Sequence, residues 1–168
     1  MASSIPSKSV TISGKDVSIP TGLFINNEFV KALGGKTFES QDPATGKVIL
    51  AIQEGQAEDV DIAVKAARKA FENGWAYSDP AWRASLLLRL ADLLEKRQDD
   101  VLAIEMADSG KTLNQASAID IPGAIGTLRY FASWADKIYG RTAATVPGTF
   151  TYTLREPIGV CGQIIPWK

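Results

Sequence analysis

The chain has 168 residues, a formal net charge of -1 and 45% hydrophobic residues, a composition typical of one or two globular domains. The 18 Lys and Arg residues against 19 Asp and Glu residues leave no surplus of positive charge, which argues against nucleic acid or an anionic lipid surface as a partner. There is no histidine, and Cys161 is the only cysteine, so histidine-based metal sites, Ser-His or Cys-His dyads and internal disulfides are excluded.

The N-terminal sequence does not look like a targeting segment. It has neither a basic stretch followed by an apolar one nor an Arg-rich presequence, and its first arginine is Arg68. No apolar stretch reaches the length of a membrane helix. Because a lone cysteine also suits a reducing compartment, the sequence predicts a cytoplasmic protein without membrane contact.

The N-terminal part is predicted to be extended. Residues 1–22 are rich in Ser, Thr and Lys without a periodic apolar pattern, which predicts a flexible tail. The apolar runs Leu23–Ile25 and Glu28–Val30 flank Asn26-Asn27, two residues that tolerate positive φ, so a tight hairpin is expected. Two further extended runs are expected at residues 36–41 and 47–52. The turn between them, at residues 42–46, contains Pro and Gly.

The hydrophobic period then changes from two to about 3.6, which predicts helices. The first helix is expected from Ala57, with a stop at Asn73-Gly74. The second is expected to begin at Asp79-Pro80, an N-cap followed by a proline at the first helical position. The residues predicted to be buried on these two helices are Val60, Ala63, Val64, Ala67 and Phe71, and Leu86, Leu90, Leu93 and Leu94.

Two more helices are predicted before the pattern changes again. A short helix is expected over residues 101–107, with Asp99-Asp100 as its cap and Ser109-Gly110 as its end. A longer helix is expected over residues 121–140, and Pro122 marks its first turn or a kink.

The C-terminal part is predicted to be β structure. Pro147-Gly148 separates residues 141–146 from residues 149–155, and in the second run apolar residues at 150, 152 and 154 alternate with polar ones, which predicts a hairpin. Residues 158–165 form a mostly apolar run, typical of a parallel-sheet strand that is buried on both faces. Because a parallel strand needs a crossover before the next strand, we expect this run to be the first strand of an α/β domain whose other elements lie beyond Lys168.

Five sequence blocks occur in the order and spacing of a known family. They are residues 23–29 (Leu-Phe-Ile-Asn-Asn-Glu-Phe), 42–46 (Asp-Pro-Ala-Thr-Gly), 58–61 (Glu-Asp-Val-Asp), 129–137 (Arg-Tyr-Phe-Ala-Ser-Trp-Ala-Asp-Lys) and 156–167 (Glu-Pro-Ile-Gly-Val-Cys-Gly-Gln-Ile-Ile-Pro-Trp). The last block is the most specific. Together, across residues 22–167, they closely resemble the N-terminal portion of NAD(P)-dependent aldehyde dehydrogenases.

The resemblance implies a partial aldehyde-dehydrogenase-like α/β fold. A subunit of the family combines a dinucleotide-binding domain, a catalytic domain and an oligomerisation hairpin that extends a sheet of a neighbouring subunit. For this chain the resemblance implies strands and helices of the cofactor domain at residues 23–140, after the flexible tail at 1–22. It implies the oligomerisation hairpin at 141–157. A truncated central strand, the first buried strand of a Rossmann-like sheet, is implied at 158–168.

The resemblance also implies a chemistry. In the family a cysteine thiolate attacks the aldehyde, hydride passes to NAD or NADP, and a glutamate-activated water releases the carboxylic acid. The nucleophile, the general base and the phosphate-binding glycine loop are expected C-terminal to Lys168, so no catalytic residue is carried over. The positions implied to approach the cofactor are Ile164, Ile165, Pro166 and Trp167, and Lys168 replaces an asparagine that donates to the oxyanion.

Several residues have both a functional and a structural interpretation. Cys161 is expected to be a small buried hydrophobe rather than a nucleophile. Glu156 is expected to cap or pair at a strand end, and Asp108 to lie in a helix-to-loop turn, rather than to act as base and acid. Some family members hold a cation near Ser40, Gln41 and Asp108, but one carboxylate does not suffice to predict a metal. The aromatic residues expected in the core rather than along a substrate channel are Tyr130, Phe131 and Trp134.

The sequence therefore predicts the N-terminal segment of an NAD(P)-dependent aldehyde dehydrogenase, inactive as an isolated chain. An aldehyde substrate and a homologous subunit are the partners implied for the complete enzyme. The alternative is a non-catalytic interaction module whose strand over residues 149–155 pairs with a full-length homologue. A third hypothesis is an independent small α/β binding domain. For the isolated chain we also expect poor solubility or a molten character.

Overall fold

The computed structural model describes residues 7–12 and 14–165. Within these residues the strands pair as antiparallel two-stranded units. The strands are β1 (Ser7–Ile12), β2 (Lys15–Pro20), β3 (Leu23–Ile25), β4 (Glu28–Val30), β5 (Thr37–Gln41), β6 (Val48–Gln53), β7 (Thr142–Ala143) and β8 (Thr151–Tyr152). The helices are α1 (Ala57–Ala70), α2 (Pro80–Lys96), α3 (Gln98–Ser109), α4 (Leu113–Gln115) and α5 (Ile121–Trp134), with the π-helical turns η1 (Phe71–Trp75) and η2 (Ala116–Asp120).

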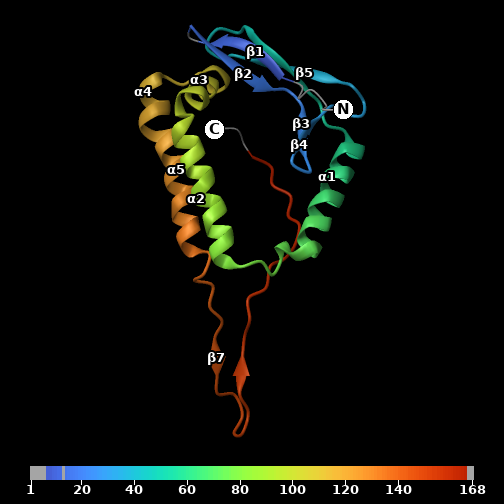
Figure 1. The fold of residues 1–168 in the computed structure, drawn as a ribbon, viewed down its shortest axis with the longest axis vertical. Coiled ribbons are helices and arrows are strands. Elements are labelled where there is room, and N and C mark those ends of the chain that lie inside the picture. The colour runs from blue at the N-terminus through green and yellow to red at the C-terminus, as the bar shows by residue number, and fades with distance from the viewer. Residues whose placement is uncertain (1–6, 13, 166–168) are drawn as a thin grey trace.

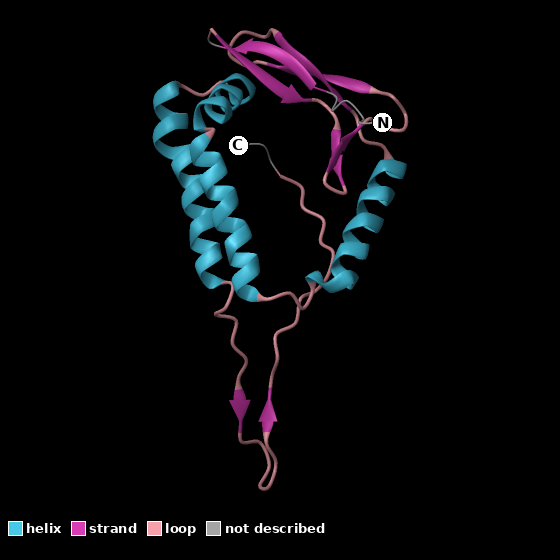
Figure 2. Ribbon diagram, in the orientation of Figure 1, coloured by secondary structure: helices cyan, strands magenta, loops and turns pink. Residues whose placement is uncertain are grey.

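The elements form an open frame (Figures 1 and 2). The N-terminal strands lie at one end of the molecule, and α2 packs along α5 on one side below them. Helix α1 stands on the other side, and the C-terminal segment rises between the two groups of helices. The hairpin of β7 and β8 projects from the opposite end.

Strands β1 and β2 form a hairpin where the sequence predicts a flexible tail, so that prediction is wrong for residues 7–12 and 15–20. The two strands pair antiparallel, with Ile12 opposite Lys15. The hairpin is held because Ile12 and Val17 are buried against Ala103 of α3. The signal for strands was that the apolar pairs Val10 and Ile12, and Val17 and Ile19, are each separated by one polar residue. The abundant Ser, Thr and Lys residues obscured this alternation.

The predicted turns are confirmed. Asn26 and Asn27 both have positive φ, 53° and 64°, and they connect β3 to β4. Between β5 and β6 the Asp42 carboxylate accepts hydrogen bonds from the Ala44 N–H at 2.8 Å and the Thr45 hydroxyl at 2.8 Å. The Thr45 hydroxyl, joined by the backbone amide of Ala44, holds the pKa of Asp42 below its ordinary value.

The helix boundaries agree with the predicted start and stop signals at several points. Helix α1 gives way to η1, where Gly74 has φ 111°. Helix α2 begins at Pro80, with the Asp79 carboxylate accepting from the Ala81 N–H at 2.9 Å. Helix α3 ends at Gly110 in the left-handed conformation.

Two helices differ from their predicted extents. Helix α3 begins before the predicted residue 101, so Asp99 and Asp100 lie in its first turn rather than at its cap. The fourth predicted helix ends at Trp134 rather than at residue 140, and Pro122 lies in its first turn. The lengths of these two helices were therefore wrong, while their existence was confirmed.

The main helical core lies between α2, α3 and α5. Its buried residues are Ala91, Ile121 and Ile125, and half-buried residues such as Leu94 pack against them. The rest of the predicted buried stripe on α2 is exposed, with Leu93 51% exposed, and on α1 Val60 is 58% exposed. No described residues form a layer over these two stripes, so the helical pattern is correct but the expected burial is not.

Residues 158–165 do not form the predicted buried strand within the part of the chain that is described. They carry no strand pairing, and the side chains of Ile158 and Ile164 are each 96% exposed. A strand needs a neighbour to satisfy its backbone hydrogen bonds, and no described strand runs beside this segment. The absence of a pairing strand explains why the apolar pattern is not accompanied by burial.

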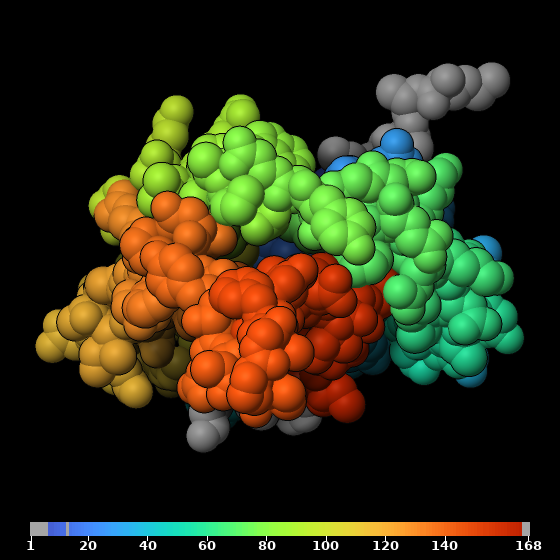
Figure 3. All heavy atoms as spheres, turned by 90° about the horizontal axis from the view of Figure 1, so that it is seen from below, coloured from blue at the N-terminus to red at the C-terminus, as the bar shows by residue number. Residues whose placement is uncertain are grey.

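The predicted C-terminal hairpin is confirmed in a shorter form. Thr142 pairs with Tyr152 and Ala143 with Thr151, and the Thr149 N–H donates to the Val146 carbonyl across the turn. Figure 3 views the molecule from the hairpin side and shows the hairpin atoms standing in front of the ends of the helices. None of the helices seen in residues 7–12 and 14–165 combines the length and the apolar character needed to cross a bilayer.

Candidate functional site

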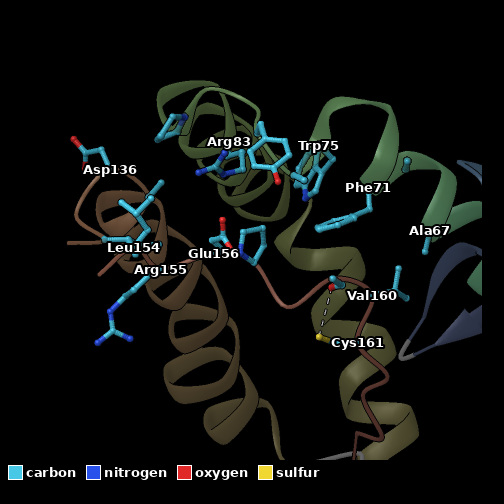
Figure 4. Close-up of a pocket in the computed structure, with 18 residues that line it drawn as sticks. Ala67, Phe71, Trp75, Arg83, Asp136, Leu154, Arg155, Glu156, Val160 and Cys161 are labelled. Atoms are coloured by element: carbon cyan, nitrogen blue, oxygen red, sulfur yellow. Dashed lines mark hydrogen bonds between the residues drawn. The ribbon is translucent and has the colours of Figure 1, made fainter. Parts of the chain in front are cut away.

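A cavity of about 890 Å³ lies where several parts of the chain meet: the end of α1 with η1, the start of α2, the residues after α5, the base of the hairpin and residues 157–161 (Figure 4). Phe71 and Trp75 give it an aromatic wall. Trp75 also contacts Trp82 edge to face, with ring centroids 5.5 Å apart. A concave, mainly apolar space with a few polar groups is the usual form of a small-molecule site.

The charged groups of this cavity are largely engaged with the protein itself. The Arg83 guanidinium donates to the Ser78 carbonyl and, at 3.2 Å, to the Ser78 hydroxyl. The Asp136 carboxylate accepts from Lys137 Nζ at 2.7 Å, and this hydrogen bond holds the pKa of Asp136 below its ordinary value. Glu156 also lines the cavity, without a cationic partner among the described residues.

Cys161 lies on the wall of the same cavity, and its side chain is exposed rather than buried as predicted. The expectation of a buried residue was wrong because no described strand pairs with this segment. The thiol donates from Sγ to the Gly159 carbonyl oxygen, at 3.6 Å. A nucleophilic thiol needs a base or a positive charge beside it, and within the described residues no hydrogen bond joins the thiol to such a side chain.

Of the residues implied to contact a cofactor, Ile164 and Ile165 do not line this cavity. Ile164 is 96% and Ile165 64% exposed, and both lie farther along the unpaired C-terminal segment. Pro166 and Trp167, like Lys168, lie outside the described residues. The structure therefore brings Glu156 and Cys161 to the cavity, but neither Ile164 nor Ile165.

The described residues do not fit the phosphates of a dinucleotide. A pyrophosphate usually binds free N–H groups at a helix N-terminus. In α1 the Asp59 carboxylate accepts from the N-cap backbone, and in α2 Asp79 accepts from the first turn. Helix α3 carries Asp99 and Asp100 in its first turn, and α5 continues directly from η2. Within residues 7–12 and 14–165, each long helix N-terminus is therefore capped, acidic or joined to another turn.

The residues considered for a cation form one contact. The Ser40 hydroxyl donates to the Asp108 carboxylate at 2.9 Å, which joins β5 to the last turn of α3. Asp108 thus lies in the last turn of α3 rather than in the helix-to-loop turn that the sequence predicts. Among the residues that the structure describes, no three His, Cys, Asp or Glu side chains are grouped so that they could hold a metal ion.

The aromatic residues of α5 are exposed, so the prediction that they lie in a core is wrong for the described structure. Tyr130 is 57%, Phe131 58% and Trp134 46% exposed. They contact one another instead, with the rings of Tyr130 and Phe131 5.3 Å apart and nearly perpendicular. As with the stripes of α1 and α2, the missing burial reflects the absence of a described layer on this side of the helix.

Sequence reasoning missed two aromatic residues between α1 and α2 and a basic residue near the start of α2. Trp75, Tyr77 and Arg83 line the cavity, but they were not singled out. The available signal was a concentration of aromatic side chains in the short link around Asn73-Gly74, where a polar turn is more usual. Aromatic side chains in a segment between two helices indicate that this segment packs against another part of the protein or against a ligand.

Comparisons with known proteins concern most of the chain. Residues 29–168 match the family model described as "Aldehyde dehydrogenase family". An aldehyde dehydrogenase from Alternaria alternata is 55% identical over 149 residues, which cover 89% of this chain and 30% of that protein. The protein named "Aldehyde dehydrogenase, cytosolic 1" from Rattus norvegicus is 49% identical over 150 residues, which cover 88% of this chain and 30% of that protein.

Part of a solved structure has the same fold as this chain. The NAD+ complex of aldehyde dehydrogenase from Bacillus cereus is similar with a TM-score of 0.79 at 45% identity, over 82% of this chain and 28% of that chain. The predicted partial aldehyde-dehydrogenase fold is thereby confirmed, and the chain spans about 30% of the length of the curated relatives named here. Because the family model matches residues 29–168, the chain belongs to the aldehyde dehydrogenase family.

Proposed function

We propose that this chain is the N-terminal part of an enzyme that oxidises an aldehyde to a carboxylic acid with NAD or NADP. The observation that carries the proposal is the continuous match of residues 29–168 to the family. The identity of 55% to a relative named aldehyde dehydrogenase supports the reaction. The NAD+ complex of the Bacillus cereus relative supports the cofactor class.

By itself the chain is not expected to catalyse this oxidation. The described residues offer no free helix N-terminus to the phosphates of the cofactor. The only thiol, that of Cys161, has a backbone carbonyl rather than a base as its hydrogen-bond partner. The residues at hand can therefore bind apolar surface, but they do not assemble a nucleophile with a base.

An assay of the purified 168-residue chain tests the proposal. Aliphatic and aromatic aldehydes are supplied with NAD or NADP, and the reduced cofactor is followed by absorbance, with the Alternaria alternata relative as the positive control. No turnover above the blank is expected for the chain alone. Sustained, enzyme-dependent reduction of the cofactor by the chain alone would contradict its inactivity.

We further propose that Ile164, Ile165, Pro166 and Trp167 contact the cofactor only when the rest of an aldehyde dehydrogenase surrounds them. The exposure of Ile164 and Ile165 supports this, because an apolar pair left in water is suited to contact with a ring system or another apolar surface. Titration calorimetry with NAD and NADP is expected to show no binding to the chain alone. Binding with a micromolar dissociation constant would contradict the dependence on other parts.

A second candidate function is an interaction module, for which the exposed hairpin is the specific observation. Phe150 is 77% and Leu154 72% exposed, and the rings of Phe150, just before β8, and of Tyr152 in β8 lie 6.0 Å apart. An exposed strand with large apolar side chains is suited to pair with the sheet edge of another chain. We propose that residues 141–157 contact a homologous subunit.

Co-purification tests this contact. The tagged chain is expressed with an untagged full-length relative, and recovery is compared with that of a Phe150→Ser, Leu154→Ser variant. Recovery of the relative with the parent chain and its loss with the variant are expected. Equal recovery with both chains would contradict a contact through the hairpin.

We propose the cytoplasm as the compartment of the protein. The relative from Rattus norvegicus that carries "cytosolic" in its name supports this, at 49% identity. Fractionation of cells that express a tagged chain is expected to place it with cytosolic markers. Enrichment with mitochondrial or membrane markers would contradict the proposal.

A further inference from the structure

The two arms of the hairpin meet at an unusually close contact at its base. A Cβ atom on Gly140 would overlap the carbonyl oxygen of Thr153 and lie 2.9 Å from its carbonyl carbon. Real Cβ atoms do not approach backbone atoms this closely, so any residue other than glycine forces the arms apart. A glycine at position 140 is therefore required by the close approach of the two arms.

Hydrogen bonds fix the arms next to this contact. The Arg141 N–H donates to the Thr153 hydroxyl at 2.9 Å, and the Thr153 N–H donates to the Arg141 carbonyl at 2.8 Å. On the side of the helices, Arg155 Nε donates to the Tyr139 carbonyl at 3.3 Å. Thr153 thus contributes both its backbone and its side chain, and the bonds lie on both sides of Gly140.

Among the described residues, few other contacts hold the direction of the hairpin. Toward its tip, the described strands pair at two positions, Thr142 with Tyr152 and Ala143 with Thr151. On the other side, α5 ends at Trp134, and the chain after Glu156 turns toward the cavity between the helices (Figures 1 and 4). A two-stranded unit of this length is marginal by itself, so its orientation depends on the contact between Gly140 and Thr153.

We propose that the close contact of Gly140 with Thr153, with the hydrogen bonds beside it, is a clamp that fixes the direction in which the hairpin leaves α5. Thr153 is a positioning residue in this clamp, and Gly140 is the residue that permits it. The consequence for association rests on the proposed contact between residues 141–157 and a homologous subunit. A hairpin that is already oriented loses less conformational freedom when it docks, so the clamp strengthens that contact.

A distance measurement on the full chain tests the clamp directly. Spin labels are placed at the exposed positions Thr127 of α5 and Ala144 of the hairpin by Thr127→Cys and Ala144→Cys, in a Cys161→Ser background. The clamp is opened by Thr153→Val, which keeps the branched shape and removes the hydroxyl, or by Gly140→Ala. Thr151→Val is the matched control. It also removes a threonine hydroxyl, but this hydroxyl is hydrogen-bonded to Thr145, at 3.0 Å, nearer the tip of the hairpin than the clamp.

A single narrow distance distribution is expected for the parent and for Thr151→Val. A clearly broader distribution is expected for Thr153→Val, and a broader or displaced one for Gly140→Ala. If Gly140→Ala does not fold, Thr153→Val alone decides. Distributions that are equally narrow in the parent and Thr153→Val, or broad already in the parent, would overturn the clamp.

Association is measured separately, so that the two proposals can fail separately. Binding of a full-length relative to the labelled chains is titrated, and Thr153→Val is expected to weaken it about tenfold relative to Thr151→Val. If the parent shows a narrow distribution that broadens in Thr153→Val but binds no relative, the clamp is supported and the proposed subunit contact is wrong. Binding that is equal in all variants, despite broadened distributions, would overturn the role of the clamp in association.

Discussion

At the scale of single residues, Asp59 joins the N-terminal strands to the helices. Its side chain is 4% exposed, and its carboxylate accepts from the Leu33 N–H at 3.0 Å and from the Gln56 N–H at 2.9 Å. One bond caps α1, and the other holds the loop that follows β4. A buried carboxylate with two backbone donors is a case in which truncation leaves both donors without partners.

Asp59→Ala is therefore expected to lower the free energy of unfolding by about 2–4 kcal/mol, since each unsatisfied buried donor costs about 1–3 kcal/mol. Urea denaturation followed by circular dichroism measures the loss. Asp61→Ala, an exposed position on the same helix, is the control and is expected to change little. Equal effects of the two substitutions would contradict the role given to Asp59.

Lys111 provides a second residue-scale prediction, on pH. Its Nζ lies 2.8 Å from Asp120 Oδ2 and 3.0 Å from Glu105 Oε1, and its side chain is 18% exposed. The hydrogen bond to Asp120, followed by that to Glu105, raises the pKa of Lys111 above its ordinary value of 10.5. A raised pKa in the folded state means that the stabilisation is complete below the unfolded-state pKa and is lost as the pH rises through the folded-state value.

The parent chain is thus expected to lose stability as the pH rises above about 10, partly through Lys111. Lys111→Met should show a smaller decline over this range of pH, because it lacks the titrating group. Lys65→Met, at an exposed position of α1, serves as the control and should decline as the parent does. Parallel pH profiles for the parent and Lys111→Met would show that the ion pairs contribute nothing measurable.

At the scale of elements, local signals were sufficient wherever the chain satisfies its own hydrogen bonds. Asn26-Asn27, Asp79-Pro80 and Gly110 each impose a turn, a helix start or a helix end through their own backbone and side-chain preferences. The hairpin of β1 and β2 was missed because it depends on α3, which lies far away in the sequence. For residues 158–165 the opposite error occurred, because a strand was predicted that the structure does not show. An apolar pattern specifies a strand only when a neighbouring strand is present.

The hairpin of β1 and β2 gives the prediction at this scale. Val17 is 3% exposed and packs with Ile12 against Ala103, and Lys15 Nζ lies 2.8 Å from Asp100 Oδ1 of α3. Val17→Ala is expected to cost about 1–3 kcal/mol of stability through the lost methyl groups and the cavity they leave. Hydrogen exchange of α3 amides should accelerate along with this loss.

Val146→Ala is the matched control, because Val146 is 59% exposed in the hairpin turn. It removes the same atoms without creating a cavity and is expected to leave both stability and exchange nearly unchanged. If residues 7–20 were a loose arm, Val17→Ala would behave like this control. That result would contradict the packing described for β1 and β2.

At the scale of the whole molecule, the candidate site and the uncovered surfaces have one cause. The exposed stripes on α1 and α2, the aromatic residues of α5 and the segment 158–165 all lie without a described layer over them. Their apolar patterns could be predicted from the sequence, since pattern follows from periodicity. Their exposure and the shape of the cavity could not, because burial depends on which other elements are present.

These surfaces predict the behaviour of the isolated chain. Contiguous exposed apolar side chains favour self-association. The purified chain is therefore expected to bind the dye ANS and to self-associate and precipitate at moderate concentration, while its packed parts still unfold cooperatively. A chain that stays monomeric at high concentration and binds no dye would contradict this expectation.

Two adjacent leucines of α2 separate the effect of exposure from that of packing. Leu93 is 51% exposed, whereas Leu94 packs against the core of Ala91, Ile121 and Ile125. Leu93→Gln removes apolar surface from water without opening the core, so higher solubility and lower dye binding at unchanged helicity are expected. Leu94→Gln places a polar group against the core and is expected to cost about 2–4 kcal/mol of stability. Both variants replace a leucine of the same helix by glutamine, so they differ only in position. Similar solubility and helicity in the two variants would contradict the exposure of Leu93 and would show that its face of α2 is covered in solution.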